Sequence, residues 1–183
     1  MTRLALPLLA VLGLGACAHR EPVTYAETAS AAARAAASVA GQAAASPQDA
    51  WDAGNAAYLV WNGGRRGWTT TASGLQYRRV GKAHPEGAQP AATDTVKVHY
   101  RGTFIDGREF DSSYSRNEPA TFPRNRVIKG WTEGVALMRE GEIYEFVIPA
   151  GLGYGSRWVG GDELPPNSTL RFSVELLDVN PAG

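Results

Sequence analysis

The sequence of 183 residues has few of the side chains on which disulfide and metal chemistry depend. Its only cysteine is Cys17, so the chain cannot form an internal disulfide. Its three histidines, His19, His84 and His99, lie far apart in the sequence, with no cysteine partner in the part expected to fold. This spacing is not that of a zinc site, and we expect neither a metal nor a cofactor.

An excess of charge of one sign is also missing. The 18 basic and 18 acidic side chains balance to a formal net charge of zero at pH 7. A balanced chain gives no reason to expect nucleic acid or an acidic substrate as a partner. We therefore predict a function without nucleic acid.

A long apolar run is missing as well, and the N-terminal run has the layout of a targeting segment. The apolar residues 4–14 are too few to span a bilayer as a stable helix. They follow Arg3 and precede the small residues Gly15 and Ala16, which is typical of a secretory signal. We predict a signal peptide over residues 1–16.

The lone cysteine lies directly after this segment. The tetrad Leu14-Gly15-Ala16-Cys17 resembles a bacterial lipobox, in which the cysteine is lipidated and becomes the first mature residue. The alternative is an ordinary signal peptide cut near the same place. Several acyl chains on Cys17 would anchor the protein stably. Because Ala18 rather than aspartate follows, we expect an anchor in the outer membrane, facing the periplasm.

Two segments separate this anchor from the remainder of the chain. Residues 17–46 are rich in alanine and poor in large apolar side chains, so they predict a tether. A dimerising helix is the alternative, but no heptad of large apolar residues is visible. Ser46 and Pro47 then favour a helix start, and we predict a short helix over residues 47–66, stopped near Gly63 and Gly64.

The pattern of residues 67–183 changes to short strands. Val96, Val98 and Tyr100 alternate with polar residues, as in a half-buried strand, and residues 143–148 and 170–179 predict further strands. Trp131, Val135 and Met138 recur at helical spacing, which predicts one helix between the strands. We therefore expect an α+β fold, an antiparallel sheet wrapped around one short α-helix, with an N-terminal helical extension.

Several short motifs follow one another within residues 74–179. In chain order they are Val98-His99-Tyr100, Phe110-Asp111-Ser112-Ser113, Val127-Ile128-Lys129-Gly130-Trp131, Glu133-Gly134-Val135, Gly153-Tyr154-Gly155 and Leu164-Pro165-Pro166-Asn167. With these motifs the region resembles an FKBP-type peptidyl-prolyl cis-trans isomerase domain. The stretch from Thr71 to Tyr77 resembles the exported bacterial branch of that family, of the macrophage infectivity potentiator type.

The resemblance implies a pocket for proline, with no covalent chemistry. Its expected members are Trp131 as the floor, Tyr100, Phe110 and Phe172 as walls, Val127 and Ile128 on the near side, Phe122 behind and Leu164 as an apolar contact. The Ile128 N–H and the Tyr154 hydroxyl would donate to substrate carbonyls. Asp111 would lie near the carbonyl of the rotating bond, with Arg116 paired to it.

The function implied is that of a folding catalyst of the cell envelope. Its partners would be proline-containing unfolded or partly folded exported polypeptides, and macrolide inhibitors are candidate ligands. The chain departs from the family pattern at Ala120 and in the loop over residues 156–163. If Trp158 and Val159 form an exposed apolar lip there, the alternative is a chaperone-like binding module with little isomerase activity.

Overall fold

The computed structural model describes residues 46–160 and 163–181, which form one antiparallel sheet with two helices. Its strands and helices, in chain order, are α2 (Pro47–Gly63), β1 (Thr69–Thr70), β2 (Gln76–Val80), β3 (Thr95–Thr103), β4 (Glu109–Ser112), β5 (Ala120–Pro123), α3 (Lys129–Val135), β6 (Ile143–Ile148) and β7 (Leu170–Val179). The 3-10 turns η1 (Arg124–Arg126) and η2 (Ala150–Leu152) precede α3 and follow β6. The α+β fold expected from the sequence is confirmed.

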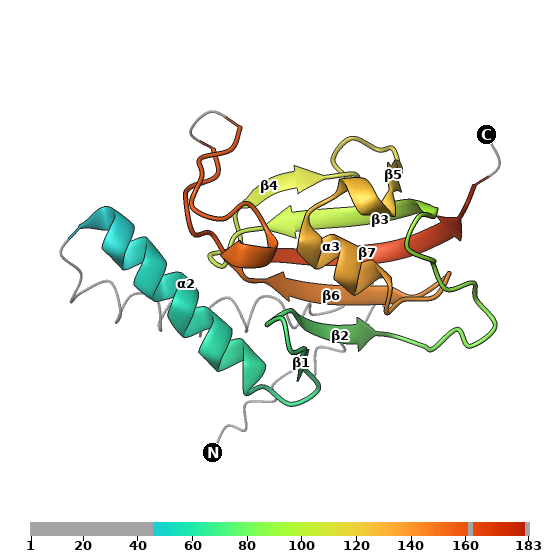
Figure 1. Ribbon diagram of the computed structural model, residues 1–183, viewed down its shortest axis with the longest axis horizontal. Coiled ribbons are helices and arrows are strands. Elements are labelled where there is room, and N and C mark those ends of the chain that lie inside the picture. The colour runs from blue at the N-terminus through green and yellow to red at the C-terminus, as the bar shows by residue number, and fades with distance from the viewer. Residues whose placement is uncertain (1–45, 161–162, 182–183) are drawn as a thin grey trace, which may run out of the picture.

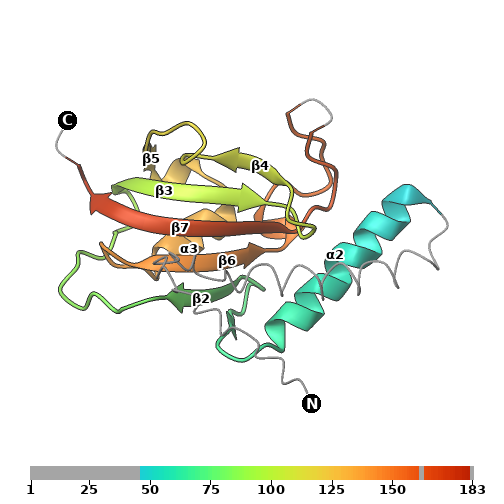
Figure 2. The same cartoon turned by 180° about the vertical axis from the view of Figure 1, so that it is seen from behind.

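The seven strands are ordered β1-β2-β6-β7-β3-β4, and β5 pairs with β3. Helix α3 covers one face of the sheet, and α2 lies beside one end of it (Figures 1 and 2). The long strands β3 and β7 pair in the middle, with Tyr100 opposite Val174 and Gly102 opposite Phe172. Because side chains alternate along a strand, Val96, Val98 and Tyr100 all enter the core beneath α3.

Two glycines allow α3 to approach the sheet closely. A Cβ atom at Gly130 would lie 2.5 Å from Cγ2 of Ile148, and one at Gly134 would lie 2.7 Å from the ring of Phe146. Both distances are far shorter than carbon atoms tolerate. The short helix therefore packs on β6 only because these two positions carry no side chain. Trp131, between them, is thereby fixed against the sheet.

Helix α3 is shorter than the sequence pattern predicts. It ends at Val135, whereas the spacing of Trp131, Val135 and Met138 extends the helix to Met138. Beyond Val135 the chain tightens, because the Leu137 and Met138 amides bond to carbonyls three residues back. Met138 is still fully buried, so its apolar side chain belongs to the core although the residue lies beyond the end of the helix.

Helix α2 is fastened to the domain by buried amide side chains. The Ser46 hydroxyl caps its first turn by accepting from the Asp49 N–H, and Pro47 follows. The Thr169 N–H donates to Oδ1 of Asn55 at 2.7 Å, and Nδ2 of Asn62 donates to Gln76 at 2.8 Å. A lost bond at either buried site would leave a polar group unsatisfied, so these contacts fix the position of the helix.

The signal peptide, Cys17 and nearly all of the predicted tether lie outside the described residues. Within residues 46–160 and 163–181, no helix is long and apolar enough to cross a membrane.

The close contact between α3 and β6 yields the first prediction. Gly134→Val should lower the free energy of unfolding by about 1 to 3 kcal/mol, because the added carbons overlap the Phe146 ring. Urea denaturation measures the change. Gly151→Val is the control, since a Cβ there would meet nothing within 4 Å. Equal losses in the two variants would contradict the packing argument.

Candidate functional site

A cavity of about 820 Å³ opens between α3, the strands and the loop that follows η2. Its lining residues are Tyr100, Phe110, Asp111, Phe122, Arg126, Val127, Ile128, Lys129, Trp131, Gly151, Gly153, Tyr154, Gly155, Ser156, Arg157 and Phe172. These residues come from β3, β4, β5, α3 and β7, from η1 and η2, and from the segments that follow these two turns. The fold thus gathers side chains from most of the chain into one site.

Trp131 is the centre of the aromatic part of this cavity. Its side chain is only 5% exposed, and three rings meet it almost perpendicularly. The ring centroids of Tyr100, Phe172 and Phe122 lie 5.2, 5.3 and 5.9 Å from that of Trp131, at interplanar angles of 90°, 89° and 82°. Edge-to-face contacts of this kind are favourable and directional. The tryptophan is therefore held in one orientation by rings from three strands.

The wall formed by Phe110 and Phe172 depends on a glycine in β3. The two rings meet edge-to-face, with centroids 5.6 Å apart. A Cβ atom at Gly102 would lie 2.8 Å from both rings. Gly102 therefore leaves the space in which Phe110 and Phe172 pack against each other beside the cavity.

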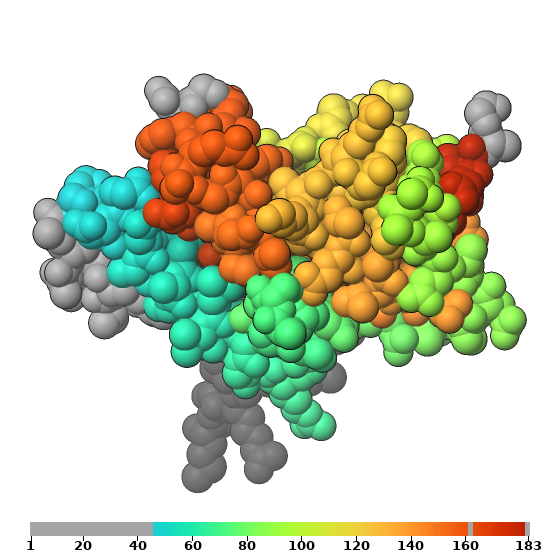
Figure 3. All heavy atoms as spheres, viewed as in Figure 1, coloured from blue at the N-terminus to red at the C-terminus, as the bar shows by residue number. Residues whose placement is uncertain are grey.

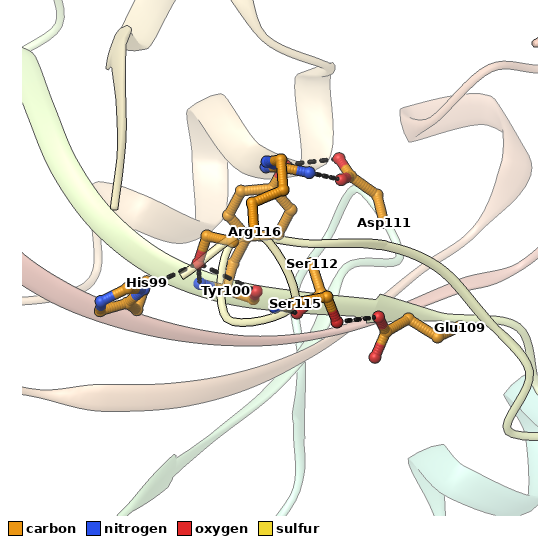
Figure 4. A network of polar contacts seen from close by, with 8 residues as sticks. His99, Tyr100, Glu109, Asp111, Ser112, Ser115 and Arg116 are labelled. Atoms are coloured by element: carbon orange, nitrogen blue, oxygen red, sulfur yellow. Dashed lines mark hydrogen bonds and ion pairs between the residues drawn. The ribbon is translucent and has the colours of Figure 1, made fainter. Parts of the chain in front are cut away.

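A polar network holds the carboxylate at the cavity rim (Figure 4). The Tyr100 hydroxyl donates to Oδ2 of Asp111 at 2.5 Å, and Arg116 forms an ion pair with the other oxygen. A second Arg116 nitrogen donates to the Tyr100 hydroxyl oxygen at 2.9 Å. The three side chains therefore fix one another, and the charge of Asp111 is balanced by Arg116.

Burial and these partners shift the ionisation of the network. Burial, followed by the hydrogen bond to Asp111, raises the pKa of Tyr100, and Arg116 opposes the shift. The hydrogen bond to Asp111 raises the pKa of Arg116. Tyr100 thus stays a neutral donor and Arg116 a cation at physiological pH.

A buried serine ties the segment after β4 back to β3. Oγ of Ser113 accepts from the Tyr100 N–H at 2.8 Å and lies 2.9 Å from Nδ1 of His99. The His99 ring in turn stacks on Tyr114 at 4.5 Å. These contacts fix the backbone from which Asp111 and Arg116 extend.

Two hydrogen-bond donors, the Ile128 amide and the Tyr154 hydroxyl, belong to residues that line the cavity and have no partner among the described residues. Among the bonds of the described residues, none is donated by the Ile128 amide or by the Tyr154 hydroxyl. The Ile128 carbonyl, by contrast, accepts from the amides of Trp131 and Thr132. Burial, followed by the charge of Asp111, raises the pKa of Tyr154, so its hydroxyl stays protonated. Both donors are available to a ligand.

The structure brings most of the expected site residues together. Nine of them line the cavity, namely Tyr100, Phe110, Asp111, Phe122, Val127, Ile128, Trp131, Tyr154 and Phe172. Phe122 was expected behind the pocket but belongs to its lining. Arg116 lies outside the lining and reaches the site through Asp111. Leu164 is buried in the core and pairs with Val159, so it does not line the cavity.

Three basic residues of the lining were missed by the sequence analysis, namely Arg126, Lys129 and Arg157. The sequence position of two of them could have identified them, because Arg126 and Lys129 directly flank the expected pocket residues Val127 and Ile128. Within the described part of the chain, no group of three or more histidine, cysteine or carboxylate side chains is placed to hold a metal ion.

Comparison with known proteins assigns the family. Residues 86–177 match the family model described as FKBP-type peptidyl-prolyl cis-trans isomerase. The chain is 51% identical over 124 residues to the FKBP-type isomerase FkpA of Aeromonas hydrophila, covering 67% of this chain and 44% of that protein. It is 51% identical over 122 residues to the FKBP-type 22 kDa isomerase of Escherichia coli (strain K12), covering 67% of this chain and 58% of that protein.

A further relative is named for the outer membrane. The outer membrane protein MIP of Legionella longbeachae is 44% identical over 126 residues, covering 69% of this chain and 53% of that protein. The chain therefore spans about half the length of the curated relatives it matches.

Solved structures agree with the sequence matches. The crystal structure of FkpA from Escherichia coli superposes with a TM-score of 0.67 at 39% identity, covering 86% of this chain and 67% of that chain. A peptidyl-prolyl isomerase from Pseudomonas syringae pv. tomato has a TM-score of 0.67 at 29% identity, and the match covers 74% of this chain and 98% of that chain. By its family match, by these identities and by its fold, the chain belongs to the FKBP-type peptidyl-prolyl cis-trans isomerase family.

Proposed function

We propose that the chain accelerates the cis-trans rotation of X-Pro bonds in exported polypeptides. The observation that carries the proposal is the cavity over Trp131, which is walled by rings and lined by two donors that have no partner among the described residues. A pyrrolidine ring is compact and apolar, and its nitrogen has no hydrogen to donate. It suits a tryptophan face enclosed by aromatic rings, and the flanking peptide carbonyls suit the Ile128 N–H and the Tyr154 hydroxyl.

The rotation is slow because the C–N bond has partial double-bond character, with a barrier of about 20 kcal/mol. At the twisted transition state the conjugation is lost and the carbonyl becomes less polar. Water favours the planar, polar ground state, whereas an apolar cavity that excludes water removes this preference. Lowering the barrier by about 7 kcal/mol would accelerate the rotation about 10⁵-fold.

The donors would act on the carbonyls that flank the proline ring, and the carboxylate would act on the carbonyl carbon of the rotating bond. The Ile128 N–H and the Tyr154 hydroxyl hold the flanking carbonyls, which preorganises the peptide around the ring on Trp131. The carbonyl carbon of a twisted amide is more electron-poor than that of a planar one. Asp111, held by Arg116 and Tyr100, would stabilise that carbon more in the twisted state than in the ground state.

The cell envelope is the proposed place of action. Residues 1–16 would direct export, and lipidated Cys17 would anchor the protein in the outer membrane through the tether of residues 17–46. The lipobox-like tetrad supports the anchor, and the similarity to an outer membrane protein supports the location. The substrates would be unfolded or partly folded exported polypeptides, and macrolide inhibitors are candidate ligands of the same cavity.

A binding module with little isomerase activity is the second candidate. Trp158 is 52% exposed and neighbours Val159, which bridges to Leu164. An exposed tryptophan beside the cavity could hold apolar segments of unfolded chains. The next prediction separates the two candidates.

Asp111→Ala should lower kcat/KM about tenfold or more on a peptide containing Ala-Leu-Pro-Phe, while the protein stays folded. The unfolding free energy should fall by no more than about 1 kcal/mol, because the Asp111–Arg116 pair is exposed. Asp106→Ala is the matched control, since Asp106 also pairs with an arginine, Arg108, but lies outside the cavity.

Either of two results would count against the role of Asp111. One is an equal loss of turnover in Asp106→Ala. The other is a stability loss of the size caused by a core Leu→Ala change, about 2 to 5 kcal/mol. Absence of turnover in the folded wild-type chain would favour the binding module.

The raised pKa of Tyr154 predicts how the donor responds to pH. Its phenol should ionise above the usual value of about 10, so turnover should not fall with Tyr154 ionisation below that pH. The difference between the alkaline absorbance titrations of the wild type and Tyr154→Phe isolates this group. A step below pH 10 in that difference would contradict the burial of the hydroxyl.

Cys17→Ser tests the anchor. In a diderm bacterial host, the wild-type chain should incorporate labelled palmitate and sediment with outer membranes. The variant should lose the label and appear in the soluble fraction, because no acyl chain holds it. Unchanged membrane association of an unlabelled variant would overturn the anchor at this residue.

A further inference from the structure

The cavity has a basic rim, which we define as Arg126, Lys129 and Arg157. All three side chains are exposed and line the same cavity as Trp131. Arg126 ends η1 and Lys129 begins α3, whereas Arg157 lies beyond η2. On the face seen in Figure 3, the orange segment after β6 lies next to the gold segment that leads into α3. The basic rim therefore borders the cavity from two sides.

The positive charge of this rim is not balanced by the cavity itself. Among the described residues of the lining, Asp111 is the single carboxylate, and it is paired with Arg116. The ion pairs found in residues 46–160 and 163–181 involve none of the three basic rim residues. Nε of Arg157 lies 3.5 Å from the carbonyl oxygen of Tyr154, which is another residue of the cavity lining.

We infer that the site selects proline-containing segments that carry aspartate or glutamate beside the proline. The inference rests on the proposed function, and it adds the substrate class. A proline seated on Trp131 places its neighbouring side chains at the rim. A carboxylate there would meet cations that form none of the described ion pairs, whereas a lysine would meet like charges. Since the whole chain is neutral, the attraction would be local to the basic rim.

The expected effect is on capture more than on the rotation itself. Charges at a rim raise the rate of encounter with a ligand of opposite charge, and salt weakens this attraction. At low salt, kcat/KM for a glutamate peptide should exceed that for a lysine peptide about tenfold. The ratio should shrink toward unity in 1 M salt, where the screening length is about 3 Å.

The experiment uses the full-length chain in a nonionic detergent. The substrates are acetylated, amidated peptides with glutamate, glutamine or lysine directly before or directly after a single proline. Blocked ends leave the varied side chain as the only charge, so a terminal carboxylate cannot mimic it. Exchange NMR measures the catalysed cis-trans rate for each peptide at low and high salt.

Two triple variants separate the rim from the overall charge. Arg126→Gln/Lys129→Gln/Arg157→Gln removes the basic rim. Arg66→Gln/Lys82→Gln/Lys97→Gln removes the same charge from residues that line no part of the cavity and form none of the described ion pairs. The ratio of kcat/KM for the glutamate peptide to that for the lysine peptide should fall toward one in the first variant and stay unchanged in the second.

Three results would overturn the inference. They are equal kcat/KM for the three peptides, a preference that survives loss of the rim, and a preference lost equally in both triple variants. If no peptide is turned over by folded protein, the proposed function fails, and fluorescence anisotropy of labelled peptides then decides the inference. Tighter binding of the glutamate peptides would support it, and equal affinities would overturn it.

Discussion

The close packing of α3 on β6 is the constraint on which the site depends. Gly130 and Gly134 leave no room for a side chain between the helix and the sheet, so Trp131 enters the core at a fixed depth. Rings from β3, β5 and β7 then meet it edge-on. A wider helix-to-sheet spacing would separate the tryptophan from these rings, and the cavity would lose its floor and its directional contacts.

A second series of ring contacts connects the cavity wall to the N-terminal helix. Trp51 of α2 contacts Phe104 edge-on at 5.8 Å, and Phe104 lies 5.1 Å from Phe110. The same helix holds the segment before β7 through the bond from Thr169 to Asn55. Helix α2 is therefore packed into the domain and supports one wall of the site.

The polar and apolar parts of the site have different physical roles. The aromatic part is buried and rigid, and it favours a dry, compact ligand. The rim is exposed, with Asp111 neutralised by Arg116 and the three cations of the basic rim unpaired among the described residues. A chain with no net charge can thus present a local positive field at its binding site. In the proposed function, the aromatic side chains would bind the proline ring, and the basic rim would select the residues beside it.

The sequence by itself determined the fold class, because strand alternation is a local signal. Its ordered motifs are local as well, and they carry the family resemblance that implies Trp131, Tyr100, Phe110 and Phe172 as members of the site. Tertiary structure decided the remainder. Phe122 lines the cavity because β5 pairs with β3, and Leu164 is buried because it pairs with Val159. The end of α3 at Val135 depends on a tightened turn. The basic rim depends on segments that meet only after folding. Contacts between residues distant in sequence leave no local pattern, and for that reason only the folded chain shows them.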